Sequence, residues 1–135
     1  MDILAYENLY NGLKDYNDSV KENRGNTIVK TPPKNPEYPL TILSEIRNVA
    51  NTSYNSNFDR VASVGYRVDI YAKKKGNITK DTIAREVAYL VDKYLTGVGL
   101  TRISFNISEL VNDSSIYQII MTYSGNLHEN RRKFI

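Results

Sequence analysis

The hydrophobic pattern of residues 65–95 changes its period part-way along, and this change restricts the possible folds more than any other feature of the chain. Apolar and polar residues alternate in GYRVDIYA, which is the pattern of a half-buried strand. Over residues 79–95 the apolar residues recur at every third or fourth position, which is the pattern of an amphipathic helix. A strand joined to a helix by a short connection predicts a sheet with that helix packed against it.

The remaining segments complete the same plan. Apolar residues at three- and four-residue spacing predict an N-terminal helix over residues 3–20. Alternation in LTILSEI, TRISFNI and IYQIIMTYSG predicts three more strands, and TIV predicts a short extended segment before them. The order of elements therefore predicts a single α+β domain. Its mainly antiparallel sheet has four to five strands, and the N-terminal helix and the helix at about 79–95 pack on one face.

The connections differ in character. All four prolines lie within residues 32–39, and proline has no backbone donor and a fixed φ. We therefore expect a rigid arm over 31–39, followed by a strand at the edge of the sheet. The polar segment 48–63 has no sustained period and is predicted to be a long loop that orders only against a partner. We expect one domain over residues 1–127 and a C-terminal tail over 128–135.

The composition excludes several classes of protein. The chain has 135 residues, of which 41% are hydrophobic and 24% charged, as in an ordinary soluble domain. It has no cysteine, which excludes disulfides and thiolate metal sites. The net charge of +3 is small for a dedicated DNA-binding protein. No apolar run is long enough to span a membrane, so we expect no membrane partner.

No pattern of catalytic residues is present. The single histidine, His128, lies in the predicted tail and has no neighbouring carboxylate pair to make it a base or a metal ligand. Neither a Gly-x-Ser-x-Gly elbow nor a glycine-rich phosphate-binding sequence occurs. Asp69 and Lys73 share a strand face, but no acid-x-Lys pair of the metal-dependent nuclease type follows. We expect no enzymatic activity, no cofactor and no metal.

Two basic clusters provide the candidate contact residues. The first lies at the junction of strand and helix and consists of Tyr71, Lys73, Lys74 and Lys75. The second lies in the predicted tail and consists of Arg131, Arg132, Lys133 and Phe134. Each cluster could contact phosphates through salt-sensitive charge interactions, or could be no more than a solvated turn and a solvated tail. The apolar end of the tail is compatible either with docking on a neighbouring subunit or with disorder.

Several segments together resemble a known family. YPLTILSEI, the polar loop, GYRVDIYAKKK, AREVAYLVDKYL, GLTRISFNI and IYQIIMTYSG follow one another as in the tail terminator (tail completion, tail-to-head joining) proteins of long-tailed bacteriophages. Tyr117, Gln118 and Tyr123 match the aromatic-Gln-x-x-x-x-Tyr pattern of that family's last strands. The likeness covers about residues 1–127 and consists of packing patterns, not of catalytic motifs.

The resemblance implies a structural virion protein of the phage neck. Such a protein forms a ring, commonly a hexamer, that caps the head-proximal end of the tail tube, stops its polymerisation and joins tail to head. The implied partners are further copies of the chain, the tail tube protein and the head connector or head-completion protein. DNA would pass through the lumen without sequence-specific binding. The resemblance also implies assembly in the host cytoplasm, a place in the virion, and a role for the two basic clusters in subunit or lumen contacts.

Two alternative functions stay open at the level of sequence. Another head–tail connector or head-closure component would also be small and free of catalytic motifs. A small nucleic-acid-binding accessory protein would instead use the two basic clusters, and its DNA affinity would fall steeply with salt. Ring assembly with little salt-sensitive DNA affinity would separate a neck protein from the accessory protein.

Overall fold

The structure is a computed structural model that describes residues 3–50, 61–109, 114–128 and 133–134. The strands form one sheet in the order β1-β2-β3-β5-β4, with β6 paired to the end of β5. Each pair of neighbouring strands is antiparallel except β1 and β2, which are parallel. The elements are α1 (Ala5–Ser19), β1 (Thr27–Val29), β2 (Leu40–Ala50), β3 (Val61–Ala72), α2 (Lys80–Gly97), β4 (Thr101–Glu109), β5 (Tyr117–His128) and β6 (Lys133–Phe134).

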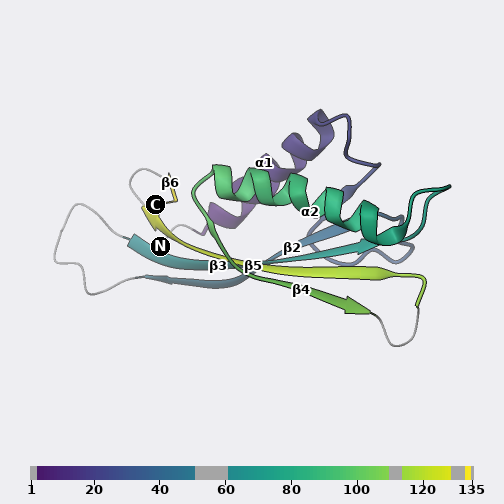
Figure 1. The fold of residues 1–135 in the computed structure, drawn as a ribbon. Helices are drawn as coiled ribbons and strands as arrows, with labels where there is room; N and C mark the ends of the chain where they lie inside the picture. The colour runs from purple at the N-terminus through teal and green to yellow at the C-terminus, as the bar shows by residue number, and fades with distance from the viewer. Residues whose placement is uncertain (1–2, 51–60, 110–113, 129–132, 135) are drawn as a thin grey trace.

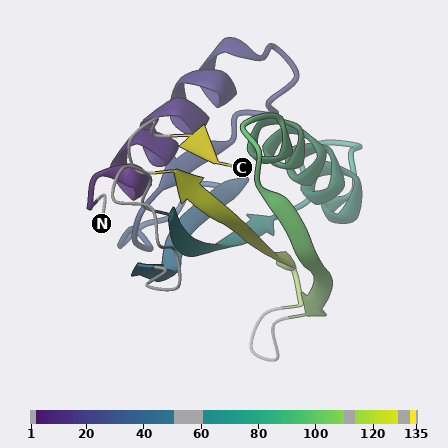
Figure 2. The same ribbon diagram turned by 90° about the vertical axis from the view of Figure 1, so that its left-hand side faces the viewer.

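Both helices cover the same face of the sheet (Figure 1), and the view turned by 90° shows them side by side above the strands (Figure 2). The opposite face carries no helix within the described ranges. The fold class predicted from the sequence is confirmed, including the mainly antiparallel sheet and the position of the two helices. The helices predicted at 3–20 and 79–95 are α1 and α2.

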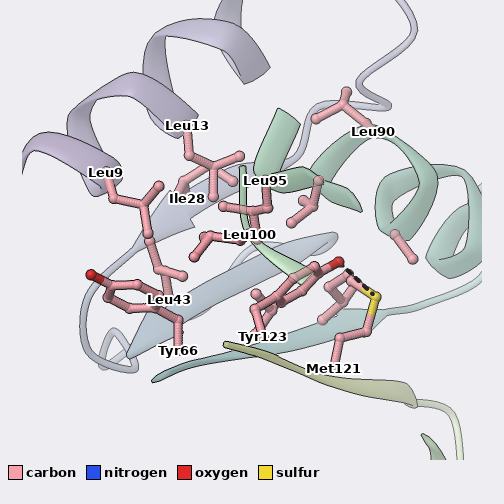
Figure 3. Close-up of a cluster of buried hydrophobic side chains, with 14 of the residues drawn as sticks. Leu9, Leu13, Ile28, Leu43, Tyr66, Leu90, Leu95, Leu100, Met121 and Tyr123 are labelled. Atoms are coloured by element: carbon pink, nitrogen blue, oxygen red, sulfur yellow. Dashed lines mark hydrogen bonds between the residues drawn. The ribbon is translucent and has the colours of Figure 1, made fainter. Parts of the chain in front are cut away.

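The hydrophobic core lies between the sheet and the two helices. Alternate residues of β3 are completely buried beneath the helices, and they are Ala62, Val64, Tyr66, Val68, Ile70 and Ala72. Figure 3 shows Leu9 and Leu13 of α1 and Leu95 of α2 gathered above Tyr66 and Tyr123 of the sheet. The alternating apolar residues of the strands and the apolar stripes of the helices are therefore buried against each other in one core. This shared core places both helices on the same face of the sheet.

A buried tyrosine links α2 to the sheet. Tyr123 Oη donates a hydrogen bond to Asp92 Oδ1 of α2 at 2.6 Å, and it lies 3.6 Å from Met121 Sδ (dashed in Figure 3). Arg102 Nη1 of β4 lies 3.4 Å from the same carboxylate oxygen of Asp92. Burial, and then the contact with Asp92, raise the pKa of Tyr123, so the phenol stays protonated and remains a donor.

The predicted loop over 48–63 is too long at both ends. β2 continues to Ala50 and β3 begins at Val61, with Val49 paired to Ser63 and Ala50 paired to Ala62. On the β2 side the added residues with described side chains are polar or exposed, and on the β3 side Ala62 and Ser63 are too small to give a clear hydrophobic alternation, so the sequence pattern did not mark these ends as strands. Residues 51–60 of the predicted loop lie outside the described residues.

The position of the strand after the proline arm also differs from the prediction. β2 was expected at the sheet edge, but β1 pairs with it from Thr27↔Leu40 to Val29↔Ile42. Three residues of extended chain before the prolines are enough to add a short parallel strand, which sequence periodicity does not detect. Beyond residue 43, no strand of the described ranges pairs with the outer side of β2.

The segment 128–135, predicted to be a tail, contributes to the sheet. β5 runs to His128, and β6 pairs back on it through Leu127↔Phe134 and His128↔Lys133. The ring of Phe134 packs edge-on against buried Tyr66, with ring centroids 6.1 Å apart. Phe134 therefore packs on the core of its own chain, whereas the sequence leaves open docking on a neighbouring subunit or disorder.

Gly12 allows the two helices to approach closely. A Cβ atom at this position of α1 would lie 2.0 Å from Tyr94 Oη of α2, whose ring packs on Tyr16 with centroids 5.3 Å apart. We expect Gly12→Ala to lower the free energy of unfolding by about 1–2 kcal/mol, because the steric conflict outweighs the higher helix propensity of alanine. Urea denaturation measures this change.

Gly97 provides the matched control for Gly12. It lies in the last turn of α2, and no atom lies within 4 Å of the position of an added Cβ. Gly97→Ala should therefore leave stability unchanged or raise it by up to about 1 kcal/mol. An equal gain in both variants would contradict the close contact between Gly12 and Tyr94.

Candidate functional site

The lysine cluster at residues 73–75 is a tight connection between β3 and α2. Lys75 and Ile78 exchange two backbone hydrogen bonds of 3.0 Å, and Gly76 between them has a φ of 60°. Lys73 Nζ lies 4.9 Å from the centroid of the Tyr38 ring, and Lys75 Nζ donates to Arg24 O at 3.2 Å. Lys74 is exposed. The ammonium groups of Lys73 and Lys75 thus contact two different segments of the chain.

Tyr71 belongs to a polar network on the face of the sheet opposite the helices. Arg67 binds Asp69 through Nη2 at 2.9 Å and through Nε at 3.0 Å, and Gln118 Nε2 donates to Asp69 Oδ1 at 3.2 Å and lies 3.1 Å from Tyr71 Oη. Burial, together with the charge of Asp69, raises the pKa of Tyr71, while the bond to Asp69 raises the pKa of Arg67. Asp69 and Gln118 are buried, so the network is an ordered part of this face.

The proline-rich arm packs beside this network. Pro32, Pro33, Pro36 and Tyr38 line a shallow hollow of about 130 Å³ together with Leu40, Ile42 and Tyr71. Leu40 pairs with Tyr71 and Ile42 pairs with Asp69, so the arm lies on the helix-free face at one end of the sheet. This contact explains why Leu40 and Ile42 are buried although they face away from both helices.

The two predicted clusters lie at opposite ends of the sheet. Ala72, just before Lys73, pairs with Tyr117 at one end of β3, whereas Val61 pairs with His128, the partner of Lys133, at the other end. Phe134 is half-buried against Tyr66, and Arg131 and Arg132 lie outside the described residues. Within the described part of the chain, the structure therefore does not join the two clusters into one basic surface.

Two edges with exposed apolar side chains are the feature that sequence reasoning missed. One follows β4 and the neighbouring side of α2, and its exposed residues are Tyr89, Ile103, Phe105 and Ile107. The other follows β2 and the start of α1, and its exposed residues are Ile3, Leu4, Ile46 and Val49. Their signal in the sequence is weak, because LTILSEIRNV and TRISFNI have the alternation of any strand and do not show which face or edge is left uncovered.

A groove of about 570 Å³ lies between the end of α1, the turn that follows it and α2. Arg24 Nε donates to Glu86 Oε2 at 2.5 Å across this groove, and Tyr16, Tyr89 and Lys93 contribute to its walls. The hydrogen bond from Arg24 lowers the pKa of the Glu86 carboxyl group. Both side chains are substantially exposed.

The described residues contain neither a metal-binding cluster nor a membrane-spanning helix. No cluster of three or more histidine, cysteine, aspartate or glutamate side chains is placed to bind a metal ion. No helix in the described ranges has the length and apolar character needed to cross a membrane.

Comparison with known proteins identifies the fold. No family model matches the chain, and no curated protein matches its sequence. Among solved structures, a chain from the virion of a native gene transfer agent particle has the same fold, with a TM-score of 0.58 and 12% sequence identity. The match covers 89% of this chain and 94% of that chain. The chain thus has the α+β fold of a virion-derived chain over nearly the full length of both.

Proposed function

We propose that this chain is a structural virion protein of the phage neck. In this proposal, copies of it form a ring, most simply a hexamer, that caps the head-proximal end of the tail tube, stops tube polymerisation and joins the tail to the head. Its partners are the tail tube protein and the head connector or head-completion protein, and DNA passes through the lumen. The chain carries out no catalysis and binds no cofactor, and it is assembled into the virion in the host cytoplasm.

The observation that carries this proposal is the fold shared with a chain of a gene transfer agent virion, which extends over 89% of this chain and 94% of the other. The order of segments that resembles phage tail terminator proteins supports the same function from the sequence. The exposed apolar edges are a third support, because a monomeric protein rarely leaves contiguous apolar strand edges in water.

The charges of the chain are compatible with a lumen through which DNA moves. The net charge is +3, and the described residues of the two basic clusters lie at opposite ends of the sheet. Lys73 faces Tyr38 and Lys75 faces Arg24 O, so two of the three ammonium groups at the connection already have contacts within the chain. A surface of this kind neutralises few phosphates, and DNA that must pass through a ring benefits from weak binding.

The decisive experiment polymerises the tail tube protein of the same phage in the presence of this chain. We expect tube growth to stop at substoichiometric amounts of the chain, and electron microscopy to show a ring at one end of each tube. DNA binding, titrated as a control, should be no tighter than ordinary non-specific binding, about 10⁻⁴–10⁻⁶ M at physiological salt.

The other outcomes point to the alternative functions. If the chain bound the isolated head connector and had no effect on tube growth, the result would reject the tail terminator function and support a connector or head-closure component. A monomer or dimer that binds DNA tightly, and loses that affinity steeply between 50 and 200 mM salt, would replace the neck protein with a nucleic-acid-binding accessory protein.

A further inference from the structure

The exposed apolar side chains lie at the two opposite edges of the four-stranded antiparallel part of the sheet. The strand order β2-β3-β5-β4 places β2 on one side and β4 on the other. At each edge the pairing register shifts by one residue, at Ile46 in β2 and at Ile103 in β4. Ile46 is 54% exposed and Ile103 is 63% exposed. Soluble monomers usually protect edge strands with charged residues, proline or bulges, but here each bulge carries an exposed isoleucine, so both edges keep apolar surface that a partner could bury.

The β4 edge projects an aromatic cluster on the helix side of the sheet. Phe105 pairs with Met121, whose side chain faces the helices, so the ring of Phe105 lies on that side as well. Tyr89 of α2 lines the same shallow hollow as Phe105 and is 64% exposed. The guanidinium carbons of Arg85 and Arg102 both lie 5.8 Å from the Phe105 centroid. This edge therefore presents aromatic rings flanked by two guanidinium groups, of which that of Arg102 is also paired with Asp92.

The β2 edge has the complementary character. Ile3, Glu45 and Ile46 line a hollow of about 280 Å³ together with Arg47 and Asn48. Glu45 is exposed and pairs with Tyr66, which faces the helices, so the carboxylate lies on the helix side of the sheet. Arg47 is turned back onto β3, where Nε donates to Ser63 Oγ at 3.1 Å and Nη2 donates to Val64 O at 3.2 Å. The edge thus presents an apolar hollow next to a carboxylate.

The strand directions allow β2 of one copy to extend the sheet beyond β4 of another copy. Since β2, β3, β5 and β4 alternate in direction, β4 runs opposite to β2. A second copy placed in the same orientation beyond β4 therefore presents its β2 antiparallel to β4, and the alternation of the sheet continues across the contact. In this arrangement the helix faces of both copies coincide. Glu45 of one copy then lies on the same face as Arg85, Arg102 and Phe105 of the other.

We propose that the outer edge of β4 pairs head-to-tail with residues 44–50 of β2 in a second copy of this chain, forming one sheet that continues from subunit to subunit. The inference rests on the proposed function, because it names the contact by which the ring would form. A head-to-tail contact closes into a ring when a whole number of subunits completes one full turn and the last subunit meets the first. Otherwise it gives an open filament. A two-fold contact of β4 with β4 would leave the exposed residues of β2 in water.

Two single substitutions and their mixture test the contact. Ile46→Lys blocks only the β2 edge and Ile103→Lys only the β4 edge, and both side chains are exposed enough that the fold should persist, as circular dichroism will check. In sedimentation velocity runs, each variant alone should self-associate about 30-fold or more weakly than the wild type, as for loss of a central interface residue. Mixed together, the two variants retain one intact contact, and they should form a dimer that grows no further.

Asn77→Lys is the matched control, because it adds the same charge at an exposed position of the connection before α2. It should assemble like the wild type. A wild-type chain that stays monomeric at about 1 mM, both alone and with tail tubes, would overturn the inference. It would also fall if the mixture of the two lysine variants formed no dimer, or if Ile46→Lys alone still formed a dimer through β4.

Disulfide trapping gives an independent measurement, and the absence of native cysteine makes it free of background. Val49→Cys and Asn106→Cys chains should form a covalent dimer when mixed and oxidised, whereas dimers within either sample alone would support a two-fold contact instead. A disulfide forms only when the two Cα atoms lie within about 7 Å of each other. Cysteines placed at positions adjacent to Val49 and Asn106 therefore test the other possible registers of the two strands. Pairing of the two edges without any effect on tail tubes would leave this inference standing and reject the neck function. Rings on tubes without pairing of the edges would support the neck function and reject this inference.

Discussion

Asn26→Leu is expected to lower the free energy of unfolding by about 3 kcal/mol, because it leaves two buried polar groups without their partners. Asn26 Nδ2 donates to Asn17 Oδ1 at 3.1 Å, and Asn26 Oδ1 accepts from Thr41 Oγ1 at 2.9 Å. Asn17 and Thr41 are completely buried, and Asn26 is nearly so. The three side chains join the end of α1 to the start of β1 and to β2, so the loss would be felt by the whole domain.

Urea denaturation of Asn26→Leu measures this loss, with Asn77→Leu as its control. Asn77 is exposed in the connection before α2, so the same change there should shift the free energy of unfolding by no more than about 0.5 kcal/mol. Adding Thr41→Val to Asn26→Leu should cost less than the sum of the two single changes, because the second change removes a hydroxyl group that the first left unpaired. Additive losses, or a near-neutral Asn26→Leu, would contradict the role of this network.

The elements of the fold that bury a regular apolar face could be predicted from the sequence. The alternating residues Tyr66, Val68, Ile70 and Ala72 of β3 and the apolar stripe of α2 predicted the layer arrangement, because burial on one side imposes the period directly. The extended segment TIV was predicted, but its pairing with β2 as β1 was not, and β6 was not predicted at all. β1 and β6 are three and two residues long, and their pairing with residues 40–42 and 127–128 depends on parts of the chain that lie close only after folding.

The candidate contact residues show a similar division. The lysine run at 73–75 could be located in the connection between strand and helix, but its contacts with Tyr38 and Arg24 come from segments distant in sequence. Ile46 and Ile103 look like ordinary strand residues in the sequence. Only the strand order and the burial show that they lie at exposed edges, and a β-bulge adds one extra residue to a strand without leaving a period that a single sequence reveals.

Gly99→Ala is expected to lower the free energy of unfolding by about 2–3 kcal/mol, through backbone strain and a steric conflict with β6. Gly99 has a φ of 107°, a conformation that favours glycine over residues with a Cβ atom. A Cβ at this position would lie 2.6 Å from the backbone oxygen of Phe134. Gly99, in the turn just after α2, thus also makes room for β6, whose Phe134 packs on Tyr66.

Removing residues 133–135 separates the two causes. If the steric conflict contributes, Gly99→Ala should cost less in the shortened chain than in the full chain, and the difference measures the part due to Phe134. The part that remains in the shortened chain measures the strain at φ 107°. Amide hydrogen exchange at Leu127, the partner of Phe134, should become faster in the full-length variant as β6 is displaced. If Gly99→Ala, like Gly97→Ala, caused no loss of stability and left exchange at Leu127 unchanged, β6 would not lie against Gly99.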